Sequence, residues 1–379
     1  MRSLRLLWMG NAASSHTERW IAALASRGHR VTLYSFTDPV GDFLSRLPGV
    51  DVESGGVSAG VAYGSDGSVR KAVYLKAVPR LVRLRRIVQP DVCHAHYASS
   101  YGVVSALAGL RPLVVSIWGA DVYTTASRSM LHRRIVSYVL RKADAVLSTS
   151  ETMRRRGLEL ADVRISVVPF GVDTSRFAPR STTSESGVLT VGAVKSLESK
   201  YGIDELLSAF ALVKRRAGDT RLRLLIAGGG SQREELGRLA MSLGIEGETH
   251  FLGSVPNARV HEIHQELDIG VYPSTDESES FGVSVVESQS CGVAVIVTRV
   301  GGLPEVVREG VTAMVVEKRN TEELASAILQ LIRDPLLRRK MGTAGREHII
   351  ERYDLNQSVA RLESIYSTLS GLSPTPESP

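Results

Sequence analysis

Short runs of β-branched and other apolar residues alternate with helix-forming stretches along nearly the whole chain, and the alternation occurs twice. In the first half we expect strands at Leu4–Met9, Arg30–Phe36, Asp91–His96, Leu113–Trp118, Ala145–Thr149 and Ile165–Val168, with helices at His16–Arg27, Val78–Val88, Tyr101–Leu110 and about Ser129–Lys142. In the second half we expect strands at Val188–Val194, Arg221–Ala227, His250–Leu252, Ile269–Tyr272, Ala294–Thr298 and Ala313–Val316, with helices at Ile203–Arg216, Gln232–Leu243, Phe281–Ser290 and Thr321–Arg333. Strands separated by helices pair in parallel, so the pattern predicts an α/β protein with two Rossmann-like domains.

A segment rich in Pro, Gly and Ser separates the two alternations, as expected for a linker. A chain of 379 residues also suits two domains of ordinary size. We therefore expect an N-terminal domain at 1–172, a linker at 173–186 and a C-terminal domain at 187–352. A helix at about 354–369 is expected to pack back on the N-terminal domain, and the tail 370–379 is expected to be disordered.

The composition, with 43% hydrophobic and 23% charged residues, is that of a soluble globular protein. No apolar run approaches the roughly 18–20 residues that span a bilayer. The N-terminus is expected to be a first strand and not a signal peptide. Cys93 and Cys291 lie far apart and outside any CxxC pattern, which disfavours both a disulfide framework and a zinc site. A reducing cytoplasm is the expected location.

The net charge is +6, and basic residues of the first half gather in three clusters. The clusters are Arg80, Arg83, Arg85 and Arg86; Arg128, His132, Arg133, Arg134, Arg141 and Lys142; and Arg154, Arg155 and Arg156. They are either solvated helix faces or a surface that meets anionic lipid headgroups or a phosphorylated acceptor. Nucleic acid is not an expected partner, because the clusters lack interleaved aromatic residues and any known binding motif.

An acidic loop follows the expected strand Ile269–Tyr272 and leads into a helix. Ligands of open parallel sheets bind beyond the carboxyl ends of the strands, close to helix N-termini. The backbone N–H groups of Phe281, Gly282 and Val283 would form an anion site there, assisted by the helix dipole. Gly282 would let a phosphate approach the backbone closely.

Two glutamates, Glu279 and Glu287, stand on either side of this helix start. Glu279 could accept hydrogen bonds from sugar hydroxyls. Glu287 lies among valines, so we expect it to be partly buried and to need donors such as the two hydroxyls of a ribose. On spacing alone, Glu279 could equally cap the helix and Glu287 could be exposed.

Lys195 and Lys200 follow the expected strand Val188–Val194, and either could neutralise a diphosphate. Gly229 and Gly230 follow the next strand and permit close approach of a ligand, although a glycine run there can also be a simple turn.

In this setting the run 279–287, ESFGVSVVE, resembles the E-x7-E element of glycosyltransferase family 4. Further stretches similar to that family occur in the expected order, namely Arg27–Val31, Asp91–His96, Pro169–Phe177, Phe251–Gly253, Pro273–Ser274, Cys291–Val295 and Gly301–Glu305. The resemblance implies the GT-B fold, with two Rossmann-like domains facing a deep interdomain cleft. It also implies a retaining glycosyltransferase of the hexosyltransferase class, which takes its sugar from a nucleotide-diphosphate sugar.

The resemblance further implies donor-binding roles. Glu279 would hold the hydroxyls of the donor sugar and Glu287 the ribose. Phe281, Gly282 and Val283 would present their backbone to the donor phosphate and sugar.

For the diphosphate, Lys200 corresponds to the lysine of the family. The arginine that usually follows the strand glycine is missing, because Gly192 is followed by Ala193. Lys195, with charge but no bidentate fork, is the expected substitute.

The acceptor side of the N-terminal domain departs more from the family. Trp118 occupies the place of a histidine that many members have, in the run WGAD. Asp121 of that run is still expected at the cleft as a catalytic residue. Asn11 after the first strand, His16 and His96 are the other acceptor-side candidates.

The implied reaction breaks the bond from the anomeric carbon to the diphosphate through an oxocarbenium-like transition state. The two lysines and the helix N-terminus would stabilise the departing phosphate. No Asp-x-Asp motif follows the strands, so no metal or other cofactor is expected. The acceptor would be a glycan or a lipid-linked molecule of polysaccharide or cell-envelope synthesis. The protein would be cytoplasmic, with peripheral contact at the inner face of an anionic membrane.

Three alternatives stay open at this point. A nucleotide-sugar 2-epimerase would share the fold and the donor but needs no acceptor. A non-catalytic nucleotide-sugar-binding protein is compatible with Ala193 and Trp118. A dinucleotide oxidoreductase is disfavoured, since no G-x-G-x-x-G opens a helix after the first strand.

Overall fold

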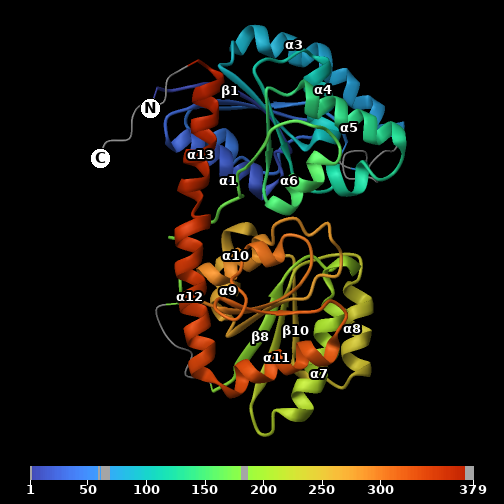
Figure 1. The fold of residues 1–379 in the computed structure, drawn as a ribbon, viewed down its shortest axis with the longest axis vertical. Helices are drawn as coiled ribbons and strands as arrows, with labels where there is room; N and C mark the ends of the chain where they lie inside the picture. The colour runs from blue at the N-terminus through green and yellow to red at the C-terminus, as the bar shows by residue number, and fades with distance from the viewer. Residues whose placement is uncertain (1, 59, 61–68, 181–186, 372–379) are drawn as a thin grey trace. The chain divides into compact units, whose positions relative to one another are not determined.

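The computed structural model describes residues 2–58, 60, 69–180 and 187–371, which fall into two compact units (Figure 1). Unit 1 comprises Met1–Phe170 and Asn356–Pro379, and unit 2 comprises Gly171–Leu355. Residues 181–186 of the expected linker and residues 372–379 of the expected tail lie outside the described residues.

Unit 1 is built on a seven-stranded sheet in the order β3-β2-β1-β4-β5-β6-β7, and all of its strand pairs are parallel. Its strands are β1 (Arg5–Met9), β2 (Arg30–Ser35), β3 (Val50–Ser54), β4 (Val92–His96), β5 (Leu113–Ile117), β6 (Ala145–Ser148) and β7 (Ile165–Val167). Its helices are α1 (Ser15–Ser26), α3 (Ala77–Val88), α4 (Gly102–Leu107), α5 (Met130–Lys142), α6 (Glu151–Leu158) and, at the end of the chain, α13 (Leu355–Leu369).

Side chains of β1 alternate between the two faces of this sheet, as a pleated strand requires. Leu7 and Met9 lie in a core cluster with residues of α3, α4, α5 and α6. Trp8 points to the other face, where its ring lies 4.5 Å from the ring of His94 on β4. The sheet therefore has one largely apolar face and one face on which aromatic rings and histidines are buried together.

Helix α13 belongs to this second face of unit 1. Its buried Glu363 accepts hydrogen bonds from Arg27 (2.7 Å) and contacts Nε2 of His29 at 2.9 Å. The hydroxyl of Tyr366, also buried, lies 2.5 Å from Nδ1 of His94. The helix expected at about 354–369 is thus joined to unit 1 by buried polar contacts as well as by apolar packing.

Unit 2 is built on a six-stranded parallel sheet in the order β10-β9-β8-β11-β12-β13. Its strands are β8 (Leu189–Val194), β9 (Leu222–Ala227), β10 (Thr249–Gly253), β11 (Ile269–Tyr272), β12 (Ala294–Thr298) and β13 (Ala313–Val316). Its helices are α7 (Ile203–Arg216), α8 (Arg233–Ser242), α9 (Val260–Glu266), α10 (Val283–Ser290), α11 (Thr321–Arg333) and α12 (Pro335–Tyr353).

The two parallel sheets covered by helices confirm the expected α/β class. Within the described residues, strand β3 and helices α6, α9 and α12 were not expected from the sequence. No helix in the described part of the chain is long and apolar enough to cross a membrane. Cys93 and Cys291 are free and buried, and burial raises the pKa of each thiol to about 12.

Candidate functional site

The carboxyl edge of the sheet in unit 2 brings together residues that are far apart in the sequence. Lys195 follows β8 and Glu279 follows β11, and Nζ of Lys195 lies 2.5 Å from Oε2 of Glu279. The side chains are only 16% and 9% exposed, so the ion pair is largely removed from water. Ser274 donates a hydrogen bond of 3.3 Å to the same carboxylate oxygen. A desolvated ion pair needs such further hydrogen bonds to be stable.

The aromatic ring of Tyr201 organises the cations of this site. Nζ of Lys195 lies 4.3 Å from the ring centroid, and Nζ of Lys200 lies 4.9 Å from it. Both distances are within the range of a cation–π interaction. Burial raises the pKa of the Tyr201 hydroxyl, while the charge of Lys195 opposes the increase. Tyr201 was not among the residues expected at the site, although an aromatic residue directly after a candidate phosphate-binding lysine was a usable signal.

Helix α10 begins at Val283, two residues later than expected, because Gly282 is its N-cap and has left-handed backbone angles (φ 79°, ψ 51°). A side chain at Gly282 would also place a Cβ 2.5 Å from the side chain of Leu303. Phe281 precedes the helix and is buried against the ring of Tyr353. The first amides of α10 have no acceptor within the helix, and they provide the positive helix end that was expected near Glu279.

Glu287 lies in the middle of α10 and is 5% exposed. The expectation that it is at least partly buried is confirmed, and the alternative that it is exposed is wrong. The alternative that Glu279 caps the helix is wrong too, since Gly282 is the N-cap and the carboxylate of Glu279 contacts Lys195 and Ser274.

A small polar network surrounds Glu287. Nε2 of His264 lies 3.5 Å from its carboxylate, and Nδ1 of the same ring contacts the hydroxyl of Ser288 at 2.8 Å. The hydroxyl of Tyr272 lies 2.6 Å from Ser288. Burial, together with the charge of Glu287, holds the pKa of Tyr272 above its usual range. His264 comes from α9, a helix that the sequence pattern does not predict, so this network could not have been predicted.

The glycine run after β9 packs against the loop that carries Lys195. A Cβ at Gly230 would lie 2.3 Å from the carbonyl oxygen of Leu197, and one at Gly229 would lie 2.4 Å from the hydroxyl of Ser254. The amide of Leu197 donates to the carbonyl of Gly229 at 2.8 Å. The glycines therefore hold the Lys195 loop in place, and their direct contact with a donor stays a prediction.

In unit 1, Asp121 begins the short helix η4 (Asp121–Thr125) and is completely buried. Its carboxylate accepts hydrogen bonds from the amides of Trp118, Gly119 and Val122, at 3.0–3.2 Å, and from Ala98 at 2.9 Å. Burial raises the pKa of Asp121, and these backbone bonds oppose the increase. Asp121 is thus buried within unit 1, where its oxygens hold two loops together, and its expected place at the cleft stays a prediction. A catalytic role is still untested.

Replacing Asp121 with asparagine is expected to lower the free energy of unfolding of unit 1 by about 1–3 kcal/mol, because an amide offers one acceptor oxygen and leaves buried amides unsatisfied. Urea unfolding followed by tryptophan fluorescence measures this. Asp91→Asn, at a partly exposed carboxylate that accepts from the amide of Arg5, is the control. Unchanged stability combined with a large loss of turnover would instead assign Asp121 a direct chemical role.

The other N-terminal candidates lie around aromatic rings. His16 stacks on Phe170 with a centroid distance of 4.3 Å, and His96 lies 4.0 Å from the ring of Trp118. Burial, with the neighbouring His94 and His16, holds the pKa of His96 well below its usual range. The side chain of Asn11 accepts from the amide of Ala13 at 3.0 Å and shapes the turn after β1.

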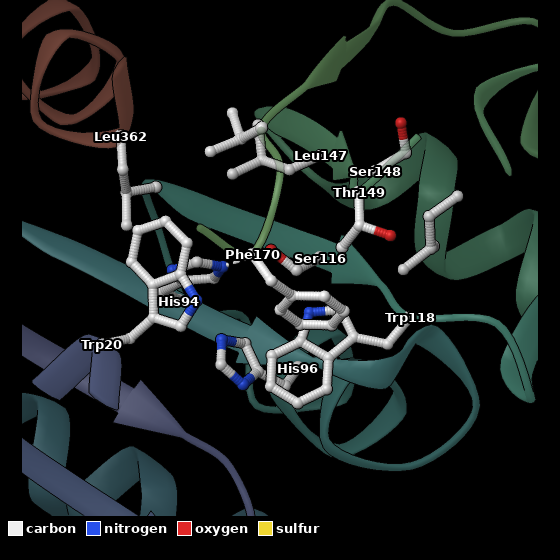
Figure 2. Close-up of a pocket in the computed structure, with 12 residues that line it drawn as sticks. Trp20, His94, His96, Ser116, Trp118, Leu147, Ser148, Thr149, Phe170 and Leu362 are labelled. Carbon is white, nitrogen blue, oxygen red and sulfur yellow. Dashed lines mark hydrogen bonds between the residues drawn. The ribbon is translucent and has the colours of Figure 1, made fainter. Parts of the chain in front are cut away.

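A cavity of about 20 Å³ in unit 1 is lined by His94, His96, Trp118 and Phe170, among others. Figure 2 shows these side chains. A volume of this size accommodates a water molecule but not a sugar. Nδ1 of His96 and the hydroxyl of Thr149 have no hydrogen-bond partner among the described residues. The structure thus brings His16 and His96 together around Trp118 in unit 1. The carboxylate of Asp121, by contrast, accepts hydrogen bonds from backbone amides. Within the part of the chain that is described, no group of three or more His, Cys, Asp or Glu is placed to hold a metal ion.

Family models match both units of this chain. Residues 175–348 match the family described as glycosyl transferases group 1, and residues 5–150 match glycosyl transferase 4-like proteins. The N-acetyl-alpha-D-glucosaminyl L-malate synthase of Bacillus anthracis is 28% identical over 73% of this chain and 74% of its own length. The GDP-mannose-dependent alpha-(1-6)-phosphatidylinositol monomannoside mannosyltransferase of Mycolicibacterium smegmatis is 30% identical over 70% of this chain and 72% of its own length.

Among solved structures, Anabaena HepE in complex with UDP and glucose superimposes with a TM-score of 0.78. The match covers 97% of this chain and 100% of that one at 20% identity, which establishes the shared fold. The two parallel sheets, the order of the motifs and these matches agree with one another. The chain belongs to the group 1, or family 4, glycosyltransferases, and it is a glycosyltransferase with the two-domain GT-B fold.

Proposed function

We propose that this enzyme transfers a hexose from a nucleotide-diphosphate sugar and that unit 2 binds the donor. The observation that carries the proposal is the pair of ammonium groups, those of Lys195 and Lys200, held over the ring of Tyr201 next to the Glu279 carboxylate. Two cations at the carboxyl edge of a parallel sheet suit a diphosphate. The dependence of the mycolicibacterial relative on GDP-mannose supports this class of donor.

In the proposed reaction, the bond between the anomeric carbon and the diphosphate oxygen breaks. The electron pair stays on the phosphate, where the two lysines and the N-terminus of α10 stabilise the growing negative charge. Glu279 keeps Lys195 in position and accepts hydrogen bonds from the sugar hydroxyls. Glu287 receives the ribose hydroxyls.

The acceptor oxygen forms the new bond on the face that the diphosphate leaves, and its proton passes to the departing phosphate. These reaction steps retain the configuration at the anomeric carbon. It uses no metal, because the lysines supply the positive charge that a divalent ion supplies elsewhere.

The proposed acceptor is a glycan or a lipid-linked molecule of polysaccharide or cell-envelope synthesis. The proposed location is the cytoplasm, with contact at the inner face of an anionic membrane. The basic clusters of the N-terminal half support this, and so does the phosphatidylinositol monomannoside in the name of the mycolicibacterial relative. The clusters lack the interleaved aromatics of nucleic-acid binders, which supports a carbohydrate or lipid partner.

A thermal-shift screen over nucleotide-diphosphate sugars tests the donor. A matched donor at about 100 times its dissociation constant is expected to stabilise unit 2 by about 2.7 kcal/mol, while the other nucleotide sugars stabilise it less. The matched donor is then supplied with a radiolabel, with and without EDTA and with a pool of glycan and glycolipid acceptors. Labelled product is expected with or without the chelator.

Conversion of the donor sugar to an epimer without any acceptor would show that the enzyme is an epimerase and not a glycosyltransferase. Binding without transfer or hydrolysis, unchanged by Glu279→Ala, would identify a non-catalytic binding protein.

A further inference from the structure

Helix α5 is one of the helices that cover the sheet of unit 1 (Figure 1), and it has a buried face and an exposed face. Its inward residues Val136, Val139 and Leu140 are buried in the core of unit 1. Its outward face carries large apolar side chains on three successive turns, Leu131 (66% exposed), Ile135 (36%) and Tyr138 (41%), with Met130 (66%) at the start of the helix. These positions follow the i, i+4, i+7 spacing of one helix face, so α5 has an apolar stripe on its outer side as well.

The same face is basic. Helix α5 contains no Asp or Glu, and the exposed side chains of Arg134, Arg141 and Lys142 flank the apolar stripe. Nζ of Lys142 lies 5.7 Å from the ring centroid of Tyr138. Neither Arg134 nor Arg141 has a carboxylate partner among the described residues.

The three basic clusters of the sequence differ in whether their cations are paired with carboxylates. In the third cluster, Arg154 is paired with Glu151 of α6, and Arg156 is paired with Glu159 directly after that helix. In the first cluster, Arg80 is paired with Glu53 at 3.0 Å. Only on α5, within the part of the chain that is described, do such cations surround three exposed apolar residues on successive turns.

We propose that this outer face of α5 is a docking surface for an anionic lipid bilayer. The proposal rests on the proposed function only in placing the enzyme at a membrane. Leu131, Ile135 and Tyr138 enter the boundary between headgroups and acyl chains, as the apolar face of an interfacial helix does. The basic side chains extend to the lipid phosphates, and their aliphatic stems lie along the apolar stripe.

A second copy of the chain fits this face poorly. A two-fold symmetric contact places the same patch of both copies together, so Arg134 and Arg141 would face cations of their own kind. A bilayer that contains anionic lipid supplies the missing negative charge and also receives the apolar stripe. Charge complementarity therefore favours the membrane as the occupant.

Flotation of the full chain with vesicles tests the proposal, using phosphatidylcholine alone and phosphatidylcholine mixed with phosphatidylglycerol. The wild-type protein is expected to float with the mixed vesicles at low salt and to remain behind with the neutral ones. Each Lys or Arg near an anionic surface contributes about fivefold to partitioning, so Arg134→Gln with Arg141→Gln is expected to weaken it about 25-fold. Leu131→Ser with Ile135→Ser is expected to weaken it about tenfold or more.

Matched controls come from other surfaces of the chain. Arg154→Gln with Arg155→Gln removes two cations from α6, and Leu336→Ser removes an apolar side chain of α12 that is 76% exposed. Both controls are expected to float like the wild type. The nucleotide-sugar thermal shift, measured on every variant, is expected to stay unchanged, so a failure of donor binding is seen separately.

Three outcomes would overturn the proposal. The wild-type protein could fail to float with the anionic vesicles. The α5 variants could float as well as the α6 control. Sedimentation could find a dimer that the α5 variants dissociate, which would make this face a protein interface.

Discussion

Replacing Glu279 with glutamine is expected to lower the turnover of sugar transfer by about 10²–10³-fold, the range found when a preorganised electrostatic group of an active site is removed. The substitution keeps the shape of the side chain but removes the charge that holds Nζ of Lys195 at 2.5 Å. The ammonium group then loses its position relative to the departing phosphate, and the sugar hydroxyls lose a charged acceptor. Initial rates at saturating donor and acceptor measure the effect.

Glu277→Gln is the matched control for this experiment. Glu277 lies in the same loop, but its carboxylate contacts Lys318 at 2.9 Å and accepts from the amide of Gly301 at 2.9 Å. Its loss is expected to leave turnover near that of the wild type. A double-mutant cycle with Lys195→Met is expected to show strong coupling, since both changes remove one ion pair. Independent effects of the two substitutions would contradict the role of Glu279 in holding Lys195.

Acidification is expected to unfold unit 1 cooperatively well above the pH at which ordinary carboxylates are protonated. Burial lowers the pKa of His94 to about 3, and that of His96 lies well below its usual range. In the unfolded chain both titrate near pH 6.5. The unfolded state therefore binds more protons below pH 6.5, and stability falls by up to about 1.4 kcal/mol per pH unit for each histidine, down to about pH 3 for His94.

The tryptophans make this measurable for unit 1 alone, because all three, Trp8, Trp20 and Trp118, lie in it. Urea unfolding curves from pH 7.5 to 4.5, followed by tryptophan fluorescence, give the free energy at each pH. His94→Gln is expected to be less stable at neutral pH, because Tyr366 and Ser116 lose their ring partner. Its stability is also expected to depend less on pH, by about one proton. An unchanged slope would mean that His94 is not a source of the acid sensitivity.

Regular periodicity predicted most of the fold. The bounds of β11, β12, β13, α7 and α11 agree with the sequence-based expectation residue for residue. These elements have a long apolar face or a continuous apolar run, which tertiary packing does not override. Each missed element lacks such a signal. Strand β3, for example, is a partly exposed edge strand with two acidic residues.

Helix α12 was missed for a different reason. Gly342 and Gly345 interrupt its apolar pattern and have low helix propensity. In the fold they are buried, Gly342 against the backbone of Gly292 and Gly345 against the side chain of Gln289. Only the tertiary neighbours explain why small residues are needed at these two positions.

The candidate site likewise has features that the sequence predicts and features that depend on tertiary structure. The placement of Glu279 near a helix start, and of Lys195 after a strand, follows from the general position of ligands in parallel sheets. The direct contact between the two side chains, and the shared ring of Tyr201, depend on loop geometry that no local pattern encodes. Asp121 shows another limit of prediction from sequence. A carboxylate in a familiar motif has the same sequence whether it faces a substrate or four backbone amides.

The chain leaves unit 1 after Phe170 and returns to it only at Asn356, so unit 2 is an insertion within unit 1. The last contributions to unit 1 are those of Glu363 and Tyr366, which contact His29 and His94. During synthesis on a ribosome, the sheet of unit 1 emerges long before the helix that covers its histidine-rich face. Nascent unit 1 therefore stays incomplete, with this aromatic and histidine-rich face uncovered, while unit 2 is translated.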